Sequence, residues 1–252
     1  MLITNIFLTK LNKKQHLIMI FFLKHDTIII KSCTGTGKTT AIAKHVSRCI
    51  SENKQMKLLT ITNKIALSDE HFKSFSNKKI NIIHYRDLKA QYDTEAEEAL
   101  TVCINSLRKF SALSKDELSQ YIVYIDEITS FLNLTHNDTL NHDLKLIFNY
   151  LMNISKYCYK FIISDAILKD SIFDILRHRD QTNFIYIENH FKKYQNIEAV
   201  KIEYKIQLLS KLKDKCKKTE YFLCGGDSRT EIMNLYLSCI EANPDKKIHF
   251  YS

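Results

Sequence analysis

Short apolar runs alternate with amphipathic stretches along most of the chain from residue 27 onward. Runs rich in Ile, Val, Leu and Tyr predict buried strands, and longer stretches with apolar residues three or four positions apart predict helices. The predicted strands are Thr27–Lys31, Lys57–Thr62, Ile80–Ile83, Leu100–Ile104, Tyr121–Ile125, Lys160–Ser164 and Phe184–Ile187. The predicted helices between them are Thr39–Ile50, Ile65–Phe75, Leu140–Ser155 and Ile167–Arg177. This order is typical of an α/β fold, in which a mainly parallel sheet carries helices on both faces.

The C-terminal part of the chain has a different organisation. A charged, glycine-poor segment, Glu188–Lys218, precedes a predicted strand at Tyr221–Cys224, a helix at Arg229–Glu241 and a last strand at Lys247–Tyr251. A single βαβ unit cannot cover both faces of its own sheet. These residues therefore predict the incomplete start of a second domain.

The segment after the first predicted strand has the features of a phosphate-binding loop. Residues 32–39, SCTGTGKT, match the pattern Gly-x4-Gly-Lys-Ser/Thr except at its first glycine. Such a loop lies between a strand and a helix, as this segment does, and two of the four glycines of the chain lie in it. A glycine-rich turn is the alternative, and it explains the Lys-Thr pair less well. We expect these residues to bind the phosphates of ATP: Thr34, Gly35, Thr36, Gly37, Lys38, Thr39 and Thr40.

Within this loop two side chains have distinct expected roles. Lys38 is expected to reach the β and γ phosphates, and the hydroxyl of Thr39 is expected to bind Mg²⁺. A second part of the site is predicted where the apolar run Tyr121–Ile125 ends in Asp126 and Glu127. A carboxylate at a strand end suits Mg²⁺, so Asp126 is the expected metal ligand and Glu127 the expected base for the attacking water. Capping of the following helix is the alternative explanation of this pair.

Composition limits the class of protein. The 252 residues are 45% hydrophobic, which is typical of a globular protein with a proper core. The net charge of +9 permits a polyanionic partner such as DNA, although a lysine-rich solvated surface gives the same number. Seven cysteines without a Cys-x-x-Cys pair indicate a reducing intracellular compartment, whether cytoplasm, nucleus or viral replication site. The apolar segment Leu17–Leu23 is too short for a membrane span and no cleavage site follows it, so neither a membrane anchor nor a signal peptide is expected.

Two other polar clusters are poor candidates for a site. The string Arg177-His178-Arg179-Asp180 contains the His-Arg-Asp of kinase catalytic loops, but no kinase-type glycine loop or Asp-Phe-Gly accompanies it. We expect a helix C-terminus there. His136 and His142 flank Asp138 without the spacing of a zinc site, and we expect them to be surface residues.

Several strings together resemble the motifs of superfamily 2 helicases. The phosphate loop is similar to motif I and Asp126-Glu127 to motif II, and the string FIISDA (161–166) occupies the place of motif III. More narrowly, the chain from about residue 26 onward resembles the replication origin-binding protein family of herpesviruses and other large DNA viruses. The strings that carry this resemblance are ITNKIALS (61–68), CINSL (103–107), DEITSF (126–131), SDA (164–166) and FLCGGDS (222–228).

The resemblance assigns roles to further residues. Thr62, Asn63 and Lys64 correspond to motif Ia, and Ser106 corresponds to motif Ib, both of which contact the DNA backbone in that family. Small hydroxyls, an amide and an ammonium group can contact phosphate without reading bases, although helix capping explains Thr62 and Asn63 as well. Ser164 and Asp165 correspond to the coupling motif, which in that family senses ATP at the cleft between the domains.

The resemblance also implies a domain plan. We expect a lead-in (1–25), a RecA-like ATP-binding P-loop NTPase domain (26–190), a linker (191–218) and the incomplete start of a second RecA-like domain (219–252). The expected function is that of a helicase core fragment of an origin-binding protein, with Mg²⁺, ATP, DNA and other replication proteins as partners. Motifs V and VI are not recognisable before Ser252, so we expect slow hydrolysis and no strand separation by this chain alone. The alternatives are a non-hydrolysing scaffold that binds nucleotide and DNA, and a P-loop ATPase of a non-helicase type such as AAA+.

Overall fold

The computed structural model describes most of the chain as two separate compact units. The described residues are 6–11, 25–87, 99–110, 113–133, 144–179, 183–191, 205–218 and 229–243. The first unit spans Met1–Lys193 and the second spans Tyr194–Ser252. All predicted site residues fall in the first unit.

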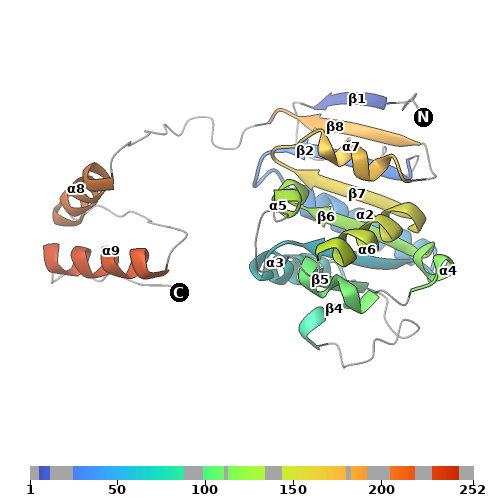
Figure 1. The fold of residues 1–252 in the computed structure, drawn as a ribbon, viewed down its shortest axis with the longest axis horizontal. Helices are drawn as coiled ribbons and strands as arrows, with labels where there is room; N and C mark the ends of the chain where they lie inside the picture. Colours follow the sequence, from blue (N-terminus) through green and yellow to red (C-terminus); the bar gives the residue numbers. More distant parts are fainter. Residues whose placement is uncertain are drawn as a thin grey trace. The chain divides into compact units, whose positions relative to one another are not determined.

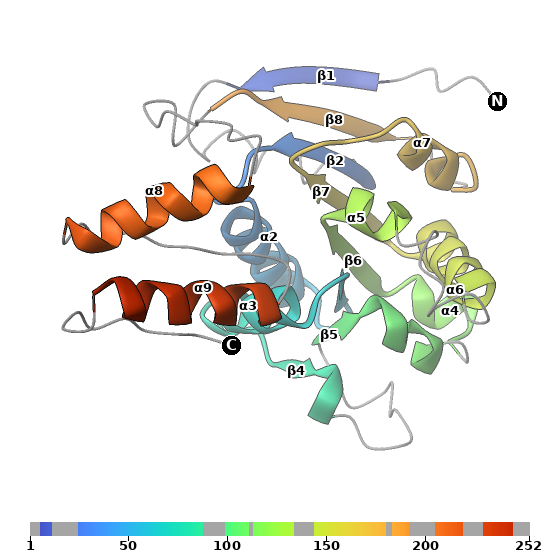
Figure 2. The same ribbon diagram turned by 60° about the vertical axis from the view of Figure 1, so that its left-hand side comes forward.

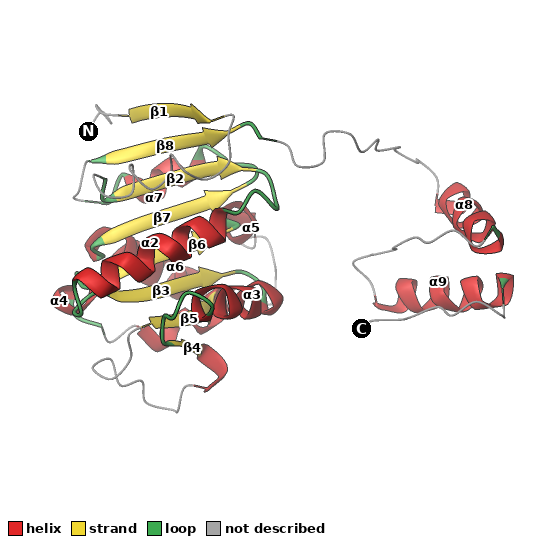
Figure 3. Cartoon of the chain, turned by 180° about the vertical axis from the view of Figure 1, so that it is seen from behind, coloured by secondary structure: helices red, strands yellow, loops and turns green. Residues whose placement is uncertain are grey.

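The first unit is built on one parallel β-sheet (Figure 1). Its eight strands lie in the order β1-β8-β2-β7-β6-β3-β5-β4, and every pair of neighbours is parallel. The strands are β1 (Ile6–Leu11), β2 (Thr27–Ser32), β3 (Lys57–Thr62), β4 (Ile82–His84), β5 (Ala99–Cys103), β6 (Tyr121–Asp126), β7 (Lys160–Asp165) and β8 (Phe184–Asn189). In Figures 2 and 3 the arrowheads of β8, β2 and β7 point to the same edge of the sheet, which is the edge where ligands bind in open α/β folds.

Helices cover both faces of the sheet. The helices of the first unit are α2 (Lys38–Glu52), α3 (Ile65–Ser76), α4 (Lys115–Leu118), α5 (Ile128–Asn133), α6 (Leu144–Tyr157) and α7 (Ser171–Leu176), and short 3-10 helices follow β4 (η1, Tyr85–Asp87) and β5 (η2, Ile104–Phe110). Apolar side chains of α2 and α3 pack in one core cluster, and those of α4, α5, α6 and α7 pack in the other. The predicted α/β class with a mainly parallel sheet is therefore confirmed.

The alternation of side chains along each strand produces these two cores. In β2, Ile28 lies in the cluster with α2, whereas its neighbour Ile29 lies in the opposite cluster. The same division separates Ile122 from Val123 in β6. Both sides of a central parallel strand are buried, which explains why these strands are continuous apolar runs in the sequence. Each such side chain, when fully buried, stabilises the fold by roughly 1.5–3 kcal/mol.

The predicted elements form close to their predicted bounds, with one larger difference. Most ends shift by one or two residues. Residues 140–143 of the predicted helix lie outside the described residues, and its described part is α6. The helix predicted from Ile167 begins only at Ser171. The reason is local, because the backbone N–H of Ile167 donates to the carboxylate of Asp165 at 3.1 Å, which holds the segment after β7 as a loop.

Some elements were not predicted from the pattern. β1 lies in the segment expected to be a lead-in, and it pairs with β8 at the edge of the sheet. The helix α4 is a single turn whose start is fixed by a capping box, in which Ser114 and Glu117 satisfy each other's backbone N–H groups. α5 is equally short. Such short elements carry too few periodic positions for a sequence pattern to show them. The apolar segment Leu17–Leu23 lies outside the described residues.

The second unit contains two helices among its described residues. α8 (Lys205–Lys217) lies in the segment expected to be a linker, and α9 (Arg229–Ala242) matches the predicted helix to within one residue. The strands expected at Tyr221–Cys224 and Lys247–Tyr251 lie outside the described residues. Among the residues that the structure describes, no helix has the length and apolar character needed to cross a membrane.

Candidate functional site

The predicted phosphate loop joins the end of β2 to the start of α2. Gly35 and Gly37 have positive φ angles of 74° and 85°, a backbone region that costs residues with a Cβ atom. The first pattern position, where a glycine is usual, is Ser32, and this residue is still part of β2. Its hydroxyl forms a 2.7 Å hydrogen bond with the hydroxyl of Thr36. Because extended backbone suits any residue, the fold tolerates serine at this position.

Lys38 begins α2, and its side chain lies over the phosphate loop. Its ammonium group donates hydrogen bonds to the carbonyl oxygens of Ser32 at 2.9 Å and Cys33 at 3.3 Å, so the side chain curls back over the loop. The N-terminus of α2 has no side-chain cap and no acidic residue in its first turn. The free N–H groups of such an end, with the helix dipole, favour a negatively charged ligand.

Asp126 ends β6 as a buried carboxylate. Its Oδ1 accepts hydrogen bonds from the hydroxyl of Ser164 on the neighbouring strand β7 and from the backbone N–H of Glu127, the latter at 3.1 Å. Burial by itself raises the pKa of Asp126, but the close approach of His71, the hydrogen bond from Ser164 and the positive charge of Lys38 outweigh it, so the pKa lies below its usual value. The group is therefore an anion at neutral pH, as a metal ligand must be.

His71 is a further neighbour of Asp126, and sequence reasoning missed it. The ring is fully buried on α3 and stacks on Tyr124, with 5.1 Å between ring centroids and 12° between planes. Its Nε2 lies 3.5 Å from Asp126 Oδ2. Neither ring nitrogen has a regular hydrogen-bond partner. The only signal in the sequence is a histidine on the buried face of a predicted helix, which does not separate this role from ordinary packing.

Glu127 has an unusual backbone. Its φ angle is 54°, in the left-handed region, which is uncommon for a residue with a side chain. Its N–H donates to the carbonyl oxygen of Ser164 at 3.0 Å, so a neighbouring strand holds this conformation in place. Strained residues of this kind gather at functional sites. The side chain is 42% exposed, and its Oε2 lies 3.9 Å from Nζ of Lys64.

Asp165 links the end of β7 to the start of α5. Its Oδ2 accepts the backbone N–H of Thr129 at 2.8 Å, and its Oδ1 accepts that of Ile167 at 3.1 Å. The hydroxyl of Thr129 in turn donates to the carbonyl oxygen of Ile167. These hydrogen bonds connect the loop after Asp165 to the helix after Glu127. No side chain other than Asp165 in this group was singled out from the sequence.

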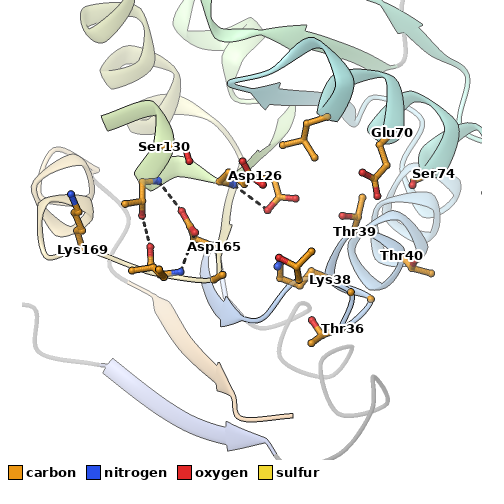
Figure 4. Close-up of a pocket in the computed structure, with 18 residues that line it drawn as sticks. Thr36, Lys38, Thr39, Thr40, Glu70, Ser74, Asp126, Ser130, Asp165 and Lys169 are labelled. Atoms are coloured by element: carbon orange, nitrogen blue, oxygen red, sulfur yellow. Dashed lines mark hydrogen bonds between the residues drawn. The ribbon is translucent and has the colours of Figure 1, made fainter. Parts of the chain in front are cut away.

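These residues surround one cavity of about 650 Å³ at the carboxyl edge of the sheet. Figure 4 shows Asp126 on one side of the cavity, with Lys38 and Thr39 on the other. Predicted residues that line it are Thr34, Gly35, Thr36, Gly37, Lys38, Thr39, Thr40, Asp126, Glu127 and Asp165. Ser164 lies behind the cavity wall, bonded to Asp126.

The residues predicted to contact DNA lie at the same edge but do not line the cavity. Thr62 is buried, and its hydroxyl donates to the carbonyl oxygen of Lys64 at 3.1 Å. Asn63 is half-buried, and its side-chain oxygen has no hydrogen-bond partner. Lys64 is 67% exposed and Ser106 is half-buried. Among these four residues, Lys64 presents a charged side chain to solvent.

The other polar clusters have structural explanations or cannot be placed. α7 ends at Leu176 with Arg177 as its C-cap, as predicted. Arg179 is buried and donates to the hydroxyl of Thr27 at 2.7 Å and to the carbonyl oxygens of Asp26 and Tyr159, so it fastens α7 to the start of β2. The cluster of His136, Asp138 and His142 lies outside the described residues, as does Asp180. The described residues contain no group of three or more His, Cys, Asp or Glu that could hold a metal ion by itself.

Solved structures share this fold. The DUF1998 helicase MrfA is 14% identical, with a TM-score of 0.61 over 92% of this chain and 38% of its own. A DEAD box protein from the hyperthermophile Methanococcus jannaschii is 16% identical, with a TM-score of 0.52 over 91% of this chain and 63% of its own. The chain thus spans between about a third and two thirds of these proteins, and at such identities the likeness shows the fold alone. It confirms the expected RecA-like architecture.

Comparison of sequences gives the family. None of the curated proteins matches the chain significantly. The family model described as "Type III restriction enzyme, res subunit" matches residues 6–165, which include the phosphate loop, both carboxylates of the Asp-Glu pair and Asp165. This range is more than half of the chain. The protein accordingly belongs to the ResIII family and has the RecA-like fold of helicase ATP-binding domains.

Proposed function

We propose that the first unit is the Mg²⁺-ATP-binding domain of a helicase, in which hydrolysis of ATP is coupled to movement along DNA or to separation of DNA strands. The observation that carries this proposal is the convergence of Lys38, Thr39, Asp126 and Glu127 on one cavity. These residues come from two separate segments of the sequence, and an anion-binding loop, a metal-type carboxylate and a base are the parts that phosphoryl transfer to water needs. The cavity volume of about 650 Å³ also falls within the range of small-molecule sites.

The phosphate loop would hold the nucleotide by exchange of partners. In this structure Lys38 is bonded to two carbonyl oxygens of its own loop. A phosphate group offers a charged acceptor in place of these neutral ones, and charge-assisted hydrogen bonds are about twice as strong. The N–H groups at the start of α2 would contact the same phosphates. The MrfA structure described as bound to DNA and AMPPNP, a related protein with a TM-score of 0.60, supports a nucleotide in this fold.

The donor set fits a magnesium ion. Thr39 supplies a hydroxyl and Asp126 a carboxylate that is ionised and has one oxygen, Oδ2, without a regular hydrogen bond. Magnesium is usually held by one or two carboxylates together with substrate phosphates and water, so no larger cluster of acidic residues is needed. When bound, the ion would neutralise charge on the phosphate oxygens.

Glu127 would act on the water. Its carboxylate lies beside Asp126 at the cavity wall and can accept a proton from the attacking water. The water oxygen bonds to the γ phosphorus, the bond from that phosphorus to the bridging oxygen breaks, and ADP leaves with the electron pair. Lys38 would offset the charge on the phosphates during this step. The backbone N–H of Glu127 is held by Ser164, which keeps this residue at the cavity wall and favours a catalytic role over that of a non-hydrolysing scaffold.

DNA is the proposed nucleic acid partner. The net charge is +9, Lys64 is exposed at the carboxyl edge, and MrfA, which shares the fold, has been solved bound to DNA. Contacts by ammonium and hydroxyl groups would go to the phosphate backbone and carry no sequence information. A role beside other proteins in replication at an origin is a narrower proposal, which rests on the sequence strings alone, and the last of them, at 222–228, lies outside the described residues.

The proposal is tested by phosphate release from ATP by the whole chain, with and without single-stranded DNA. We expect release to require Mg²⁺, to be lost in Lys38→Ala, and to rise when DNA is added. A parallel arm with RNA of the same length separates the two nucleic acids. Binding of ATP that is indifferent to Mg²⁺ and to Lys38 would contradict the proposal.

A further inference from the structure

One helix touches both carboxylates of the Asp-Glu pair. Lys64 is the N-cap of α3, and its Nζ lies 3.9 Å from Glu127 Oε2. Two turns further along the same helix, the Nε2 of His71 lies 3.5 Å from Asp126 Oδ2. The two contacts differ in kind, because His71 is fully buried whereas Lys64 is 67% and Glu127 42% exposed. The contact to Asp126 is thus fixed, and the contact to Glu127 can be exchanged.

Hydrogen bonds hold the backbones of both Lys64 and Glu127 in place. The backbone carbonyl of Lys64 accepts a hydrogen bond from the buried hydroxyl of Thr62 at 3.1 Å. The backbone of Glu127 is held by the carbonyl oxygen of Ser164. With both backbones anchored, the ammonium and carboxylate groups can part only by rotation of their side chains. Exposed pairs of this kind are weak, and a phosphate with its higher charge density competes well for the ammonium group.

A second feature marks the same place as a contact for a ligand. The side-chain oxygen of Asn63, next to Lys64, is buried and has no hydrogen-bond partner. A buried polar atom without a partner is costly and needs an explanation. A water or a base N–H group that arrives with a bound strand would supply the missing donor. Asn63 and Lys64 would then meet the same strand.

We propose that Lys64 restrains Glu127 until a backbone phosphate of DNA takes its ammonium group. This inference rests on the proposed function, because it assigns to that site the residue through which DNA controls it. With Lys64 in place, Glu127 is turned towards an exposed cation. With Lys64 on a phosphate, the carboxylate is released to face the water in the cavity. Lys64 is a positioning residue in this scheme, since it acts on the reaction through Glu127.

The test is a double-mutant cycle in DNA affinity, which needs no hydrolysis. A fluorescent single-stranded oligonucleotide is titrated with the whole chain as wild type, Glu127→Gln, Lys64→Met and the double variant. In Glu127→Gln the ammonium group is already free, so we expect affinity to rise about two- to fivefold, the range of an exposed ion pair. In the Lys64→Met background the same substitution is expected to change nothing.

The control is Glu70→Gln, which removes a carboxylate from α3 at the same cavity. If Glu70→Gln tightens DNA binding as much as Glu127→Gln, or if the gain persists without Lys64, the effect is a general change of charge and the inference is wrong. If the wild type binds DNA and Glu127→Gln binds it no more tightly, this inference is wrong but the proposed function stands. Absence of DNA binding by the wild type overturns the proposed function as well.

A kinetic readout separates restraint from a structural role. In Lys64→Met we expect phosphate release without DNA to rise about two- to fivefold at an unchanged KM for ATP, and the further stimulation by DNA to shrink. Lys64→Arg keeps a cation at this position and should restore the low rate. A residue that only stabilised the fold would lower the rate in both variants. That outcome would contradict the restraint of Glu127.

Discussion

His71 and Asp126 face each other at 3.5 Å, with the imidazole stacked on Tyr124 and the carboxylate anchored by Ser164. The hydroxyl of Tyr124 forms a 2.9 Å hydrogen bond with that of Ser164, so the four side chains make a closed ring of contacts. Ser164 holds one carboxylate oxygen and His71 faces the other. This arrangement fixes the direction of Asp126 from two elements at once, which is what an ordered metal ligand requires.

The first prediction concerns this ring. His71→Phe keeps the aromatic stacking on Tyr124 but removes the ring nitrogens near Asp126. Outer partners of a metal ligand typically contribute 10- to 100-fold in metal affinity. We therefore expect the Mg²⁺ concentration for half-maximal ATP binding to rise by about tenfold, with a melting temperature close to that of the wild type. An unchanged Mg²⁺ requirement would show that His71 only fills space.

A second prediction tests the phosphate loop. Lys38→Ala removes a charge-assisted hydrogen bond to phosphate, which typically contributes about 1.5–3 kcal/mol, or roughly tenfold or more in affinity. Lys44→Ala is the matched control, because Lys44 lies on the exposed side of the same helix α2. Titration with ATP and Mg²⁺ should separate the two variants. Equal affinity in both would remove Lys38 from the site.

The third prediction is a pH dependence of stability. Burial, with the positive charges of Lys160 and Arg48, lowers the pKa of His45 from 6.5 to about 4 in the folded protein. Between these pH values His45 binds a proton in the unfolded chain but not in the folded chain, so the free energy of unfolding falls as pH falls from about 6.5 to 4. The loss is about 3 kcal/mol at most, from the value of one pKa unit.

Urea unfolding at pH 7 and pH 5 measures this dependence. In His45→Leu the number of protons taken up on unfolding should fall by about one, so the free energy of unfolding should depend less on pH. His84, whose pKa is also lowered by burial, contributes in the same direction to both proteins, so the comparison isolates His45. Equal slopes for the two proteins would mean that His45 is not the group responsible.

A fourth prediction concerns DNA. If contacts go to the phosphate backbone, the logarithm of the affinity should fall linearly with the logarithm of the salt concentration, and unrelated sequences of one length should bind equally well. Lys64→Met should reduce the slope for a single strand by roughly 0.7. A flat response to salt, or a strong preference for one sequence, would argue against backbone contacts.

The fold and the phosphate loop could be predicted from the sequence because they depend on local pattern. The run Ile28–Ile30 is buried on both sides of the sheet and therefore reads as a continuous apolar segment. Gly35 and Gly37 occupy the positions that need positive φ angles. Asp126 follows a buried strand and so falls at its carboxyl end. In each case the residue types in a short stretch of sequence indicate the local backbone geometry.

The rest of the site depends on contacts between distant segments. His71 meets Asp126 across 55 residues of sequence, and Thr129 meets Asp165 through backbone atoms that carry no sequence signal. The left-handed backbone of Glu127 is set by Ser164 on another strand, although glutamate does not favour that region. Tertiary hydrogen bonds override local preference at these positions, and the sequence alone could not show them.

The role of Glu127 decides whether the site hydrolyses ATP. The most direct measurement is single-turnover hydrolysis of ATP labelled at the γ phosphate, with protein in excess, Mg²⁺ and single-stranded DNA, for the wild type and Glu127→Gln. A general base typically contributes about 10²–10⁴-fold in rate. We predict that Glu127→Gln binds ATP at least as tightly as the wild type but releases labelled phosphate at least 100-fold more slowly, on the order of the lower end of that range. Equal rates in the two proteins, or a wild type that binds ATP and never cleaves it with DNA present, would contradict the account.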